Sequence, residues 1–357
     1  MRILIAAPHD HYNPYCRELG GGYVRAGAEV VYGLDTFWAS NLPVDLVHVH
    51  WPEYLLDHWM TAEADGRTVC DCLQRWRRSA KVIATIHNAL PHTPGSAWRS
   101  YYESVYALCD GFVHHGERSR EWLSRAFPAL AGRPSLIARF AAYTSFPCDM
   151  TRDAARAALR IAADECVILV FGHWRTRAEL RYVARGVRRA HVPRKRLLLH
   201  GLLPARRFGR VLNRLERWRT LALVRNTRYP ALLPPEKVQI PFRAADLLVI
   251  QRLRGLNSAN VPLALAFGLP IVSPDVGVFG EEVRRLGNFV FDPADPDSLA
   301  RALETAFDAD LPAIGLRNLE AARSELTWEA SARAILAFAR GLGGVRPLFA
   351  PAGQPNP

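Results

Sequence analysis

Histidine and acidic side chains recur near the ends of the apolar runs in the first third of the chain, where they could exchange protons with a ligand. These runs are residues 2–7, 45–51 and 81–87. A general base must accept a proton within reach of a hydroxyl and have a pKa near the working pH. The candidates for this role are Asp10, Glu53 and His87. The residues expected beside them are His9, His11, His50, Trp51, Asn88 and His92.

We interpret these side chains as parts of one functional site, because the carboxyl ends of parallel strands meet at the same edge of a sheet. Residue type alone does not rank Asp10, Glu53 and His87. For Glu53 the alternative is a carboxylate in the first turn of a helix, where the helix dipole favours it.

Residues 255–270 indicate a different chemistry, the binding of an anion. Small polar residues precede an apolar run, 261–267, which ends at Gly268, and Pro262 suits the first turn of a helix. A polar loop that opens a helix at the end of a strand presents free N–H groups and a positive dipole to an anion such as a diphosphate. The loop residues expected to bind it are Asn257, Ser258, Ala259 and Asn260. The alternative is an ordinary strand-to-helix turn with an N-cap.

Arginines elsewhere in the second half could reach the same diphosphate. Gly172 follows an apolar run and allows close approach of the backbone. Arg175 and Arg177 can each donate two parallel hydrogen bonds to phosphate oxygens, and Arg252 comes just before the polar loop. The alternative is that these are surface residues of a chain in which nearly all of the positive charge is arginine.

The elements that must position these residues follow from the alternation of apolar runs and helical patterns. Strands are expected at 2–7, 28–33, 45–51, 81–87, 111–115, 167–172, 196–201, 245–251 and 271–273. Helices are expected at 14–26, 62–79, 100–108, 177–190, 262–267 and 328–342. This order predicts an α/β protein with two doubly wound parallel sheets. We expect domains at 1–145 and 146–327 with a ligand cleft between them, and a disordered Gly/Pro-rich tail at 343–357.

Composition narrows the choice of partner. The chain of 357 residues carries 46 basic and 34 acidic side chains, a formal charge of +12. Such a charge suits phosphorylated ligands or an anionic membrane leaflet, and no nucleic-acid-binding module is recognisable. The six cysteines lack metal-type spacing. No metal is expected, because arginines and a helix dipole can neutralise a diphosphate and no acidic metal-binding cluster is evident. With neither a signal peptide nor a transmembrane run in the sequence, we expect a cytoplasmic protein that can associate with the inner face of the membrane.

Three segments resemble bacterial glycosyltransferases of the GT-B fold. They are residues 46–56 (LVHVHWPEYLL), 85–92 (TIHNALPH) and 257–270 (NSANVPLALAFGLP). The resemblance covers residues 1 to about 340 and is nearest to the xanthan-pathway type, which transfers β-mannose from GDP-mannose to a polyprenyl-diphosphate glycolipid. It is more distant from the family 4 glycosyltransferases.

The resemblance implies two facing Rossmann-like domains, with the nucleotide-sugar (GDP-mannose or a UDP-sugar) on the second domain and the acceptor on the first. It places the diphosphate near Gly172, Arg175 and residues 257–260, and His87 near the donor sugar. The helix at 328–342 would cross back to the first domain. The acceptor would be a lipid-linked saccharide or a small metabolite.

The chain also departs from the pattern of many retaining GT-B enzymes, which carry two glutamates eight residues apart. The matching positions are Gly255 and Leu263, and the xanthan type also lacks the pair, which favours an inverting enzyme. A second interpretation is a non-catalytic GT-B protein that serves as a partner or scaffold in a glycosyltransferase complex.

Overall fold

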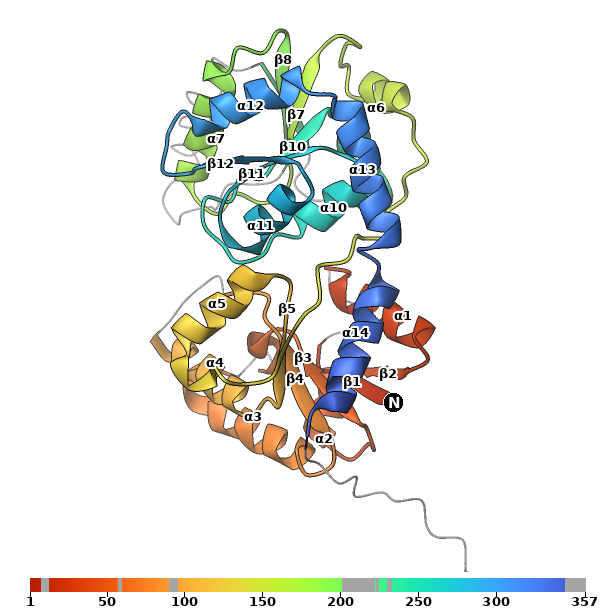
Figure 1. Ribbon diagram of the computed structural model, residues 1–357, viewed down its shortest axis with the longest axis vertical. Helices are drawn as coiled ribbons and strands as arrows, with labels where there is room; N and C mark the ends of the chain where they lie inside the picture. The colour runs from red at the N-terminus through yellow and green to blue at the C-terminus, as the bar shows by residue number, and fades with distance from the viewer. Residues whose placement is uncertain are drawn as a thin grey trace, which may run out of the picture. The chain divides into compact units, whose positions relative to one another are not determined.

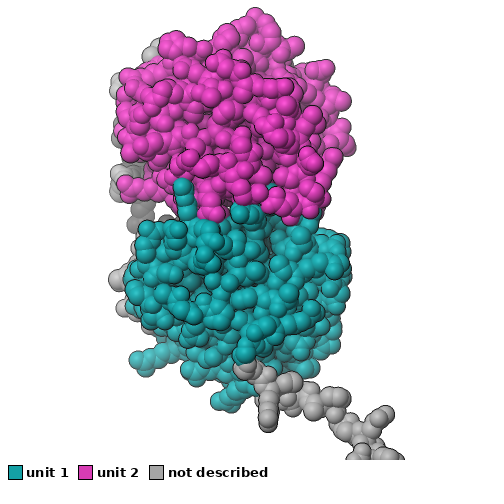
Figure 2. Space-filling model, in the orientation of Figure 1, with its two compact units in different colours: residues 1–141, 326–357 teal, residues 142–325 magenta. Residues whose placement is uncertain are grey.

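The computed structural model divides the chain into two compact units. It describes residues 1–7, 13–56, 60–89, 96–200, 222, 225–229 and 233–343. Unit 1 comprises Met1–Ala141 with Leu326–Pro357, and unit 2 comprises Ala142–Glu325 (Figure 2). The domain ends expected at 145 and 327 lie a few residues further along the chain than these divisions.

Unit 1 is built on a six-stranded parallel sheet with the strand order β2-β1-β3-β4-β5-β6. The strands are β1 (Arg2–Ile5), β2 (Glu29–Tyr32), β3 (Leu46–Val49), β4 (Lys81–Thr85), β5 (Gly111–His114) and β6 (Ser135–Ile137). The helices are α1 (Tyr15–Arg25), α2 (Leu34–Ala39), η1 (Pro52–Leu55), α3 (Ala62–Trp76), α4 (Ser96–Ala107), α5 (Glu117–Ala126), η2 (Pro128–Leu130) and α14 (Trp328–Gly341). In Figure 1, α1 and α14 lie together on one side of this sheet, and α3 and α4 lie on the other.

Unit 2 contains a second six-stranded parallel sheet, with the order β12-β11-β10-β7-β8-β9. The strands are β7 (Cys166–Val170), β8 (Lys195–His200), β9 (Asn226–Tyr229), β10 (Leu247–Val249), β11 (Ile271–Pro274) and β12 (Phe289–Phe291). The helices are α6 (Arg152–Ala158), α7 (Arg177–Arg189), α9 (Pro235–Ala244), α10 (Asn260–Ala266), α11 (Gly277–Arg285), α12 (Ser298–Asp308) and α13 (Leu311–Ser324).

The predicted fold class, two doubly wound parallel sheets, is confirmed. The central strands are continuous apolar runs because helices cover both faces of each sheet; Ile3, Leu4 and Ile5 of β1 are fully buried. The strand order reverses between β1 and β3 in unit 1 and between β7 and β10 in unit 2. In such sheets ligands bind outside the carboxyl ends of the strands at these reversals. No helix in the described ranges is both long and apolar enough to cross a membrane.

Helix α14 packs against α1, although more than 300 residues separate them in the sequence. A Cβ atom at Gly22 of α1 would lie 2.4 Å from the carbonyl oxygen of Trp328 in α14, so the two backbones are in close approach. At the other end of α14, the Lys81 Nζ donates hydrogen bonds to the carbonyl oxygens of Ala339 and Leu342. A cation at this end satisfies carbonyls that the helix leaves open.

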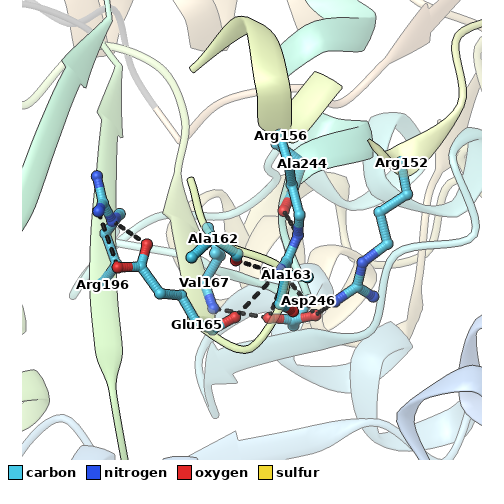
Figure 3. A network of polar contacts seen from close by, with 9 residues as sticks. All are labelled: Arg152, Arg156, Ala162, Ala163, Glu165, Val167, Arg196, Ala244 and Asp246. Atoms are coloured by element: carbon cyan, nitrogen blue, oxygen red, sulfur yellow. Dashed lines mark hydrogen bonds and ion pairs between the residues drawn. The ribbon is translucent and has the colours of Figure 1, made fainter. Parts of the chain in front are cut away.

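A polar network ties the amino ends of β7, β8 and β10 to α6 (Figure 3). The Asp246 carboxylate accepts hydrogen bonds from Arg156 at 2.9 and 3.1 Å and from the Val167 amide at 2.7 Å. Arg156 is buried and also donates to the backbone carbonyl of Glu165, whose carboxylate pairs with Arg196. Because the charges are paired and hydrogen-bonded, they fix this edge of the sheet. The opposite, carboxyl edge holds the predicted ligand site.

Candidate functional site

In unit 2 the candidate site surrounds the peptide that links Phe171 to Gly172, just beyond β7. Gly172 has φ +94°, a conformation that L side chains rarely adopt. The Phe171 carbonyl accepts hydrogen bonds from Asn260 Nδ2 at 2.6 Å and from Gln251 Nε2 at 3.0 Å. The Gly172 amide donates to His200 Nδ1 at 3.2 Å. Side chains from the ends of β8 and β10 and the start of α10 therefore hold this turn in place.

Two arginines beside this turn, Arg175 and Arg252, lie close to one buried carboxylate, that of Glu179. One Glu179 oxygen accepts hydrogen bonds from the backbone amides of Arg175 at 2.8 Å and Thr176 at 3.2 Å, as part of the capping box of α7. The same oxygen accepts from Arg252 Nη1 at 3.1 Å. These three side chains bring two positive charges and one negative charge to the turn.

The pKa values of both arginines are lowered, mainly by burial. Burial lowers the pKa of Arg175, and the neighbouring Arg252 lowers it further. Burial also lowers the pKa of Arg252, and Glu179 opposes that shift. An anion placed beside the pair would relieve the repulsion between the two guanidiniums. The capping box of α7, a Thr-x-x-Glu pattern, is the sequence signal that could have identified Glu179.

The other predicted donor-side residues lie where the sequence placed them, at the starts of two helices. Arg177 is the first residue of α7. Asn257 and Ser258 are half-buried in the loop before α10, and Ala259 is its exposed N-cap residue. The strand–loop–helix order is confirmed, and α10 ends before Gly268, which has φ +63°. Because α10 spans only seven residues, binding of an anion at this point would depend mainly on the arginines.

In unit 1 the structure brings His50, Trp51 and His87 together at the carboxyl ends of β3 and β4. His50 Nδ1 lies 3.1 Å from His87 Nε2, and the Trp51 and His87 rings stack with centroids 4.2 Å apart. All three side chains are buried. Burial, reinforced by neighbouring histidines, lowers the pKa of His50 and His87 well below the ordinary value. Both imidazoles are therefore neutral at pH 7.

Sequence reasoning missed the residues that complete this histidine cluster, which we define as His48, His50, His87, His115, Tyr15 and Trp51. The Tyr15 ring stands edge-on to His87 at 4.5 Å, and the His48 ring lies 4.1 Å from that of His50. His48 is held by Tyr23 and Thr85, each at 2.8 Å. Over the described part of the chain, no group of His, Cys, Asp and Glu is arranged to hold a metal ion.

Glu53 lies near the start of η1 and contacts α4. The Tyr102 hydroxyl donates a hydrogen bond to Glu53 Oε2, and the Tyr101 hydroxyl donates to the Pro52 carbonyl at 2.7 Å. Burial raises the pKa of Glu53, and the hydrogen bond from Tyr102 opposes this shift. Asn88 is half-buried directly after His87. The remaining predicted residues, His9, Asp10, His11 and His92, lie outside the described residues.

The two doubly wound parallel sheets define an α/β protein of the GT-B fold class. No protein-family model and no curated protein matches the sequence. Among solved structures, sucrose-phosphate synthase from Thermosynechococcus elongatus is similar, with a TM-score of 0.70 and 16% identity over 96% of this chain and 99% of that chain. HepE from Anabaena, in complex with UDP-glucose, has a TM-score of 0.68 and 13% identity, covering 96% of this chain and all of its own.

A third similar structure is a glycosyltransferase from Rickettsia africae, with a TM-score of 0.65 and 11% identity over 96% of this chain and 98% of that chain. At these identities the likeness shows the fold. It does not single out the mannosyltransferase type that the sequence resembles.

Proposed function

We propose that this protein is a glycosyltransferase that moves a hexose from a nucleoside-diphosphate sugar to an acceptor hydroxyl. The observation that carries the proposal is the pair of guanidiniums, Arg175 and Arg252, that lie beside the Gly172 turn, where the strand order of unit 2 reverses. Fixed cations at this point would stabilise the charge that develops on a leaving diphosphate. The complex of HepE with UDP-glucose on the same fold supports a nucleotide-sugar as donor. Between the expected donors, it favours a UDP-sugar over GDP-mannose.

We assign the general base to Glu53 ahead of His87. A base works best with a pKa near the operating pH, and burial moves the pKa of Glu53 upward toward neutrality. The same effect moves the pKa of His87 downward, which makes its imidazole a weaker proton acceptor. Direct deprotonation of the acceptor by this carboxylate corresponds to an inverting reaction. Asp10 remains a candidate on residue type.

The acceptor we propose is a lipid-linked saccharide or a small metabolite. The formal charge of +12 supports the first choice, because a basic protein is attracted to the anionic leaflet that displays a polyprenyl-diphosphate saccharide.

Calorimetric titration of the full chain with GDP, UDP, ADP and dTDP tests the donor site. Arg175→Ala should weaken binding of the preferred nucleotide by about 1–3 kcal/mol, because it deletes a charge-assisted phosphate contact. The substitution leaves the capping box intact, since Arg175 enters it through its backbone amide. Arg188→Ala replaces an exposed arginine in the last turn of α7, the helix that begins two residues after Arg175; it is the matched control and should bind as the wild type does. Unchanged affinity in Arg175→Ala would remove this residue from the site, and failure of the wild type to bind any nucleotide would overturn the proposal.

A further inference from the structure

We propose that unit 1 carries a separate binding site for a phosphoryl group, in the cavity between α5 and the strands β5 and β6. The cavity has a volume of about 300 Å³, and its polar lining comes from His114, Arg120, Ser124, Arg133 and Ser135. This site is independent of the proposed transferase activity. His114 and His115 are neighbours at the end of β5, and side chains of successive residues in a strand point to opposite faces. His115 joins the histidine cluster, whereas His114 contacts Ser119 of α5.

The hydrogen bond to Ser119 fixes which nitrogen of His114 carries the proton. His114 and Ser119 are both fully buried, and His114 Nδ1 lies 2.9 Å from the Ser119 hydroxyl. Among the described residues this hydroxyl has no other hydrogen-bond partner. If Nδ1 donated, the hydroxyl hydrogen would be buried without an acceptor, which is unfavourable. The hydroxyl therefore donates to Nδ1, and the proton of the neutral ring resides on Nε2.

This tautomer leaves a buried donor on His114, one of the residues that line the cavity. Within the described ranges, His114 Nε2 is buried and has no hydrogen-bond partner. Burial, then His115 and Arg120, lower the pKa of His114 to about 3, so the ring stays neutral at pH 7. Arg120 lines the same cavity, so its positive charge lies near this ring. The Nε2–H group lacks an acceptor, and the residue that carries it borders a cavity large enough for a small ligand.

The charge of the lining specifies an anionic acceptor. Arg120 and Arg133 line the cavity, and none of its lining residues is acidic. Arg120 pairs with Glu117 at 2.5 Å, but both side chains are about half exposed, so water weakens that pair. Arg133 donates to the carbonyl of Ala107, the last residue of α4, and to that of Cys109 just beyond it, and is thereby held in place.

A phosphoryl group matches this set of donors. Its oxygens can accept from the His114 Nε2–H, the Ser135 hydroxyl and the two guanidiniums, and arginine is well suited to phosphate. A volume of about 300 Å³ is at the small end for ligand pockets, which favours inorganic phosphate or a small phosphomonoester.

The first experiment is nuclear magnetic resonance of the histidine side chains in the full ¹⁵N-labelled chain, titrated with inorganic phosphate at constant ionic strength. We expect His114 to show a neutral ring protonated at Nε2, and the Nε2–H signal to shift with added phosphate. A ring protonated at Nδ1, or an Nε2–H signal that phosphate leaves in place, would overturn the proposal. Repeating the titration with glycerol phosphate distinguishes the two possible ligands. Tighter binding than that of inorganic phosphate would identify a phosphomonoester as the ligand, and weaker binding would identify free phosphate.

Variants separate this cavity from the proposed diphosphate site, which could also attract phosphate. Arg120→Gln should weaken phosphate binding, measured by the shift of the His114 signal, about tenfold. This is the effect expected for the loss of one charged contact. Arg125→Gln, on the same helix with a largely exposed side chain outside the cavity, should bind phosphate as the wild type does. Arg175→Ala should also leave this binding unchanged. Wild-type affinity in a folded Arg120→Gln protein would contradict the assignment.

Discussion

At the scale of single residues, burial moves the pKa values of Glu53 and His87 in opposite directions, and that difference separates two candidates that residue type alone could not rank. A buried carboxyl binds its proton more tightly, whereas a buried imidazole releases it more readily. Glu53 keeps a compensating hydrogen bond from Tyr102, which limits the rise in its pKa. The net effect is a pKa of Glu53 that is raised above its ordinary value, in the direction that suits a general base.

Tyr102→Phe should therefore raise the pKa of Glu53 further. Because turnover requires the ionised carboxylate, the acidic limb of the kcat/KM profile should move to higher pH. The measurement is turnover of a nucleotide-sugar from pH 5 to pH 9. Tyr101→Phe is the control, since its hydroxyl binds the Pro52 carbonyl and not the carboxylate. An acidic limb that stays in place in Tyr102→Phe would indicate that Glu53 is not the base.

The sequence predicted which residue types would lie at the strand ends, but not all of their partners. His50, Trp51 and His87 could be placed together because β3 and β4 were recognised as parallel strands. Tyr15 and His115 joined them through contacts that no local spacing encodes. For the same reason the sequence did not indicate that Glu179 would neutralise part of the charge on Arg252.

At the scale of elements, the close approach of α1 and α14 depends on Gly22. Gly22→Ala should lower the free energy of unfolding by about 1–3 kcal/mol, because the new methyl group would overlap the Trp328 carbonyl. Chemical denaturation measures the change. Gly21→Ala is a matched control: a Cβ atom there meets only the Arg25 side chain, at 3.4 Å. Both substitutions raise helix propensity equally, so Gly21→Ala should be neutral or stabilising. Equal effects of the two substitutions would contradict the close packing of α14 on α1.

Sequence analysis found several strands that are continuous apolar runs, and it missed several shorter or more polar elements. The central strand β7 was predicted from its apolar run, and the structure buries four successive residues of it. The edge strand β6 has three residues, all half-buried, and was not predicted. Helix α5 was missed because its sequence, ERSREWLSRA, offers too few apolar residues for a recognisable stripe. The helix expected from residue 100 begins at Ser96 instead.

At the scale of the whole molecule, several histidines are buried in the neutral form, and this should make the protein sensitive to acid. Burial lowers the pKa of His48 and His114 to about 3 and of His200 to about 4, and the pKa values of His50 and His87 are also well below 6.5. The unfolded chain would bind these protons below about pH 6.5, whereas the folded chain does not. Stability is therefore present above that pH and is lost as the pH falls toward the folded-state values.

We expect the free energy of unfolding to fall between pH 6.5 and pH 4.5 by more than about 1.4 kcal/mol per pH unit, the slope of a single proton. Denaturant titrations at several pH values measure the slope. His48→Gln should reduce it by the contribution of one histidine, and His191→Gln, at an exposed position where the ring pairs with Glu304, should change it less. A stability independent of pH over this range would show that these histidines are not held neutral by burial.

The proposed transfer of a sugar from a nucleotide is tested by the release of nucleoside diphosphate when the full chain is incubated with UDP- and GDP-linked hexoses. We predict release from one donor, which Arg175→Ala and Glu53→Gln should both reduce and which Arg188→Ala should leave unchanged. Absence of release from every nucleotide-sugar, with lipid-linked saccharide and small-metabolite acceptors supplied, would contradict the claim and favour a non-catalytic GT-B protein.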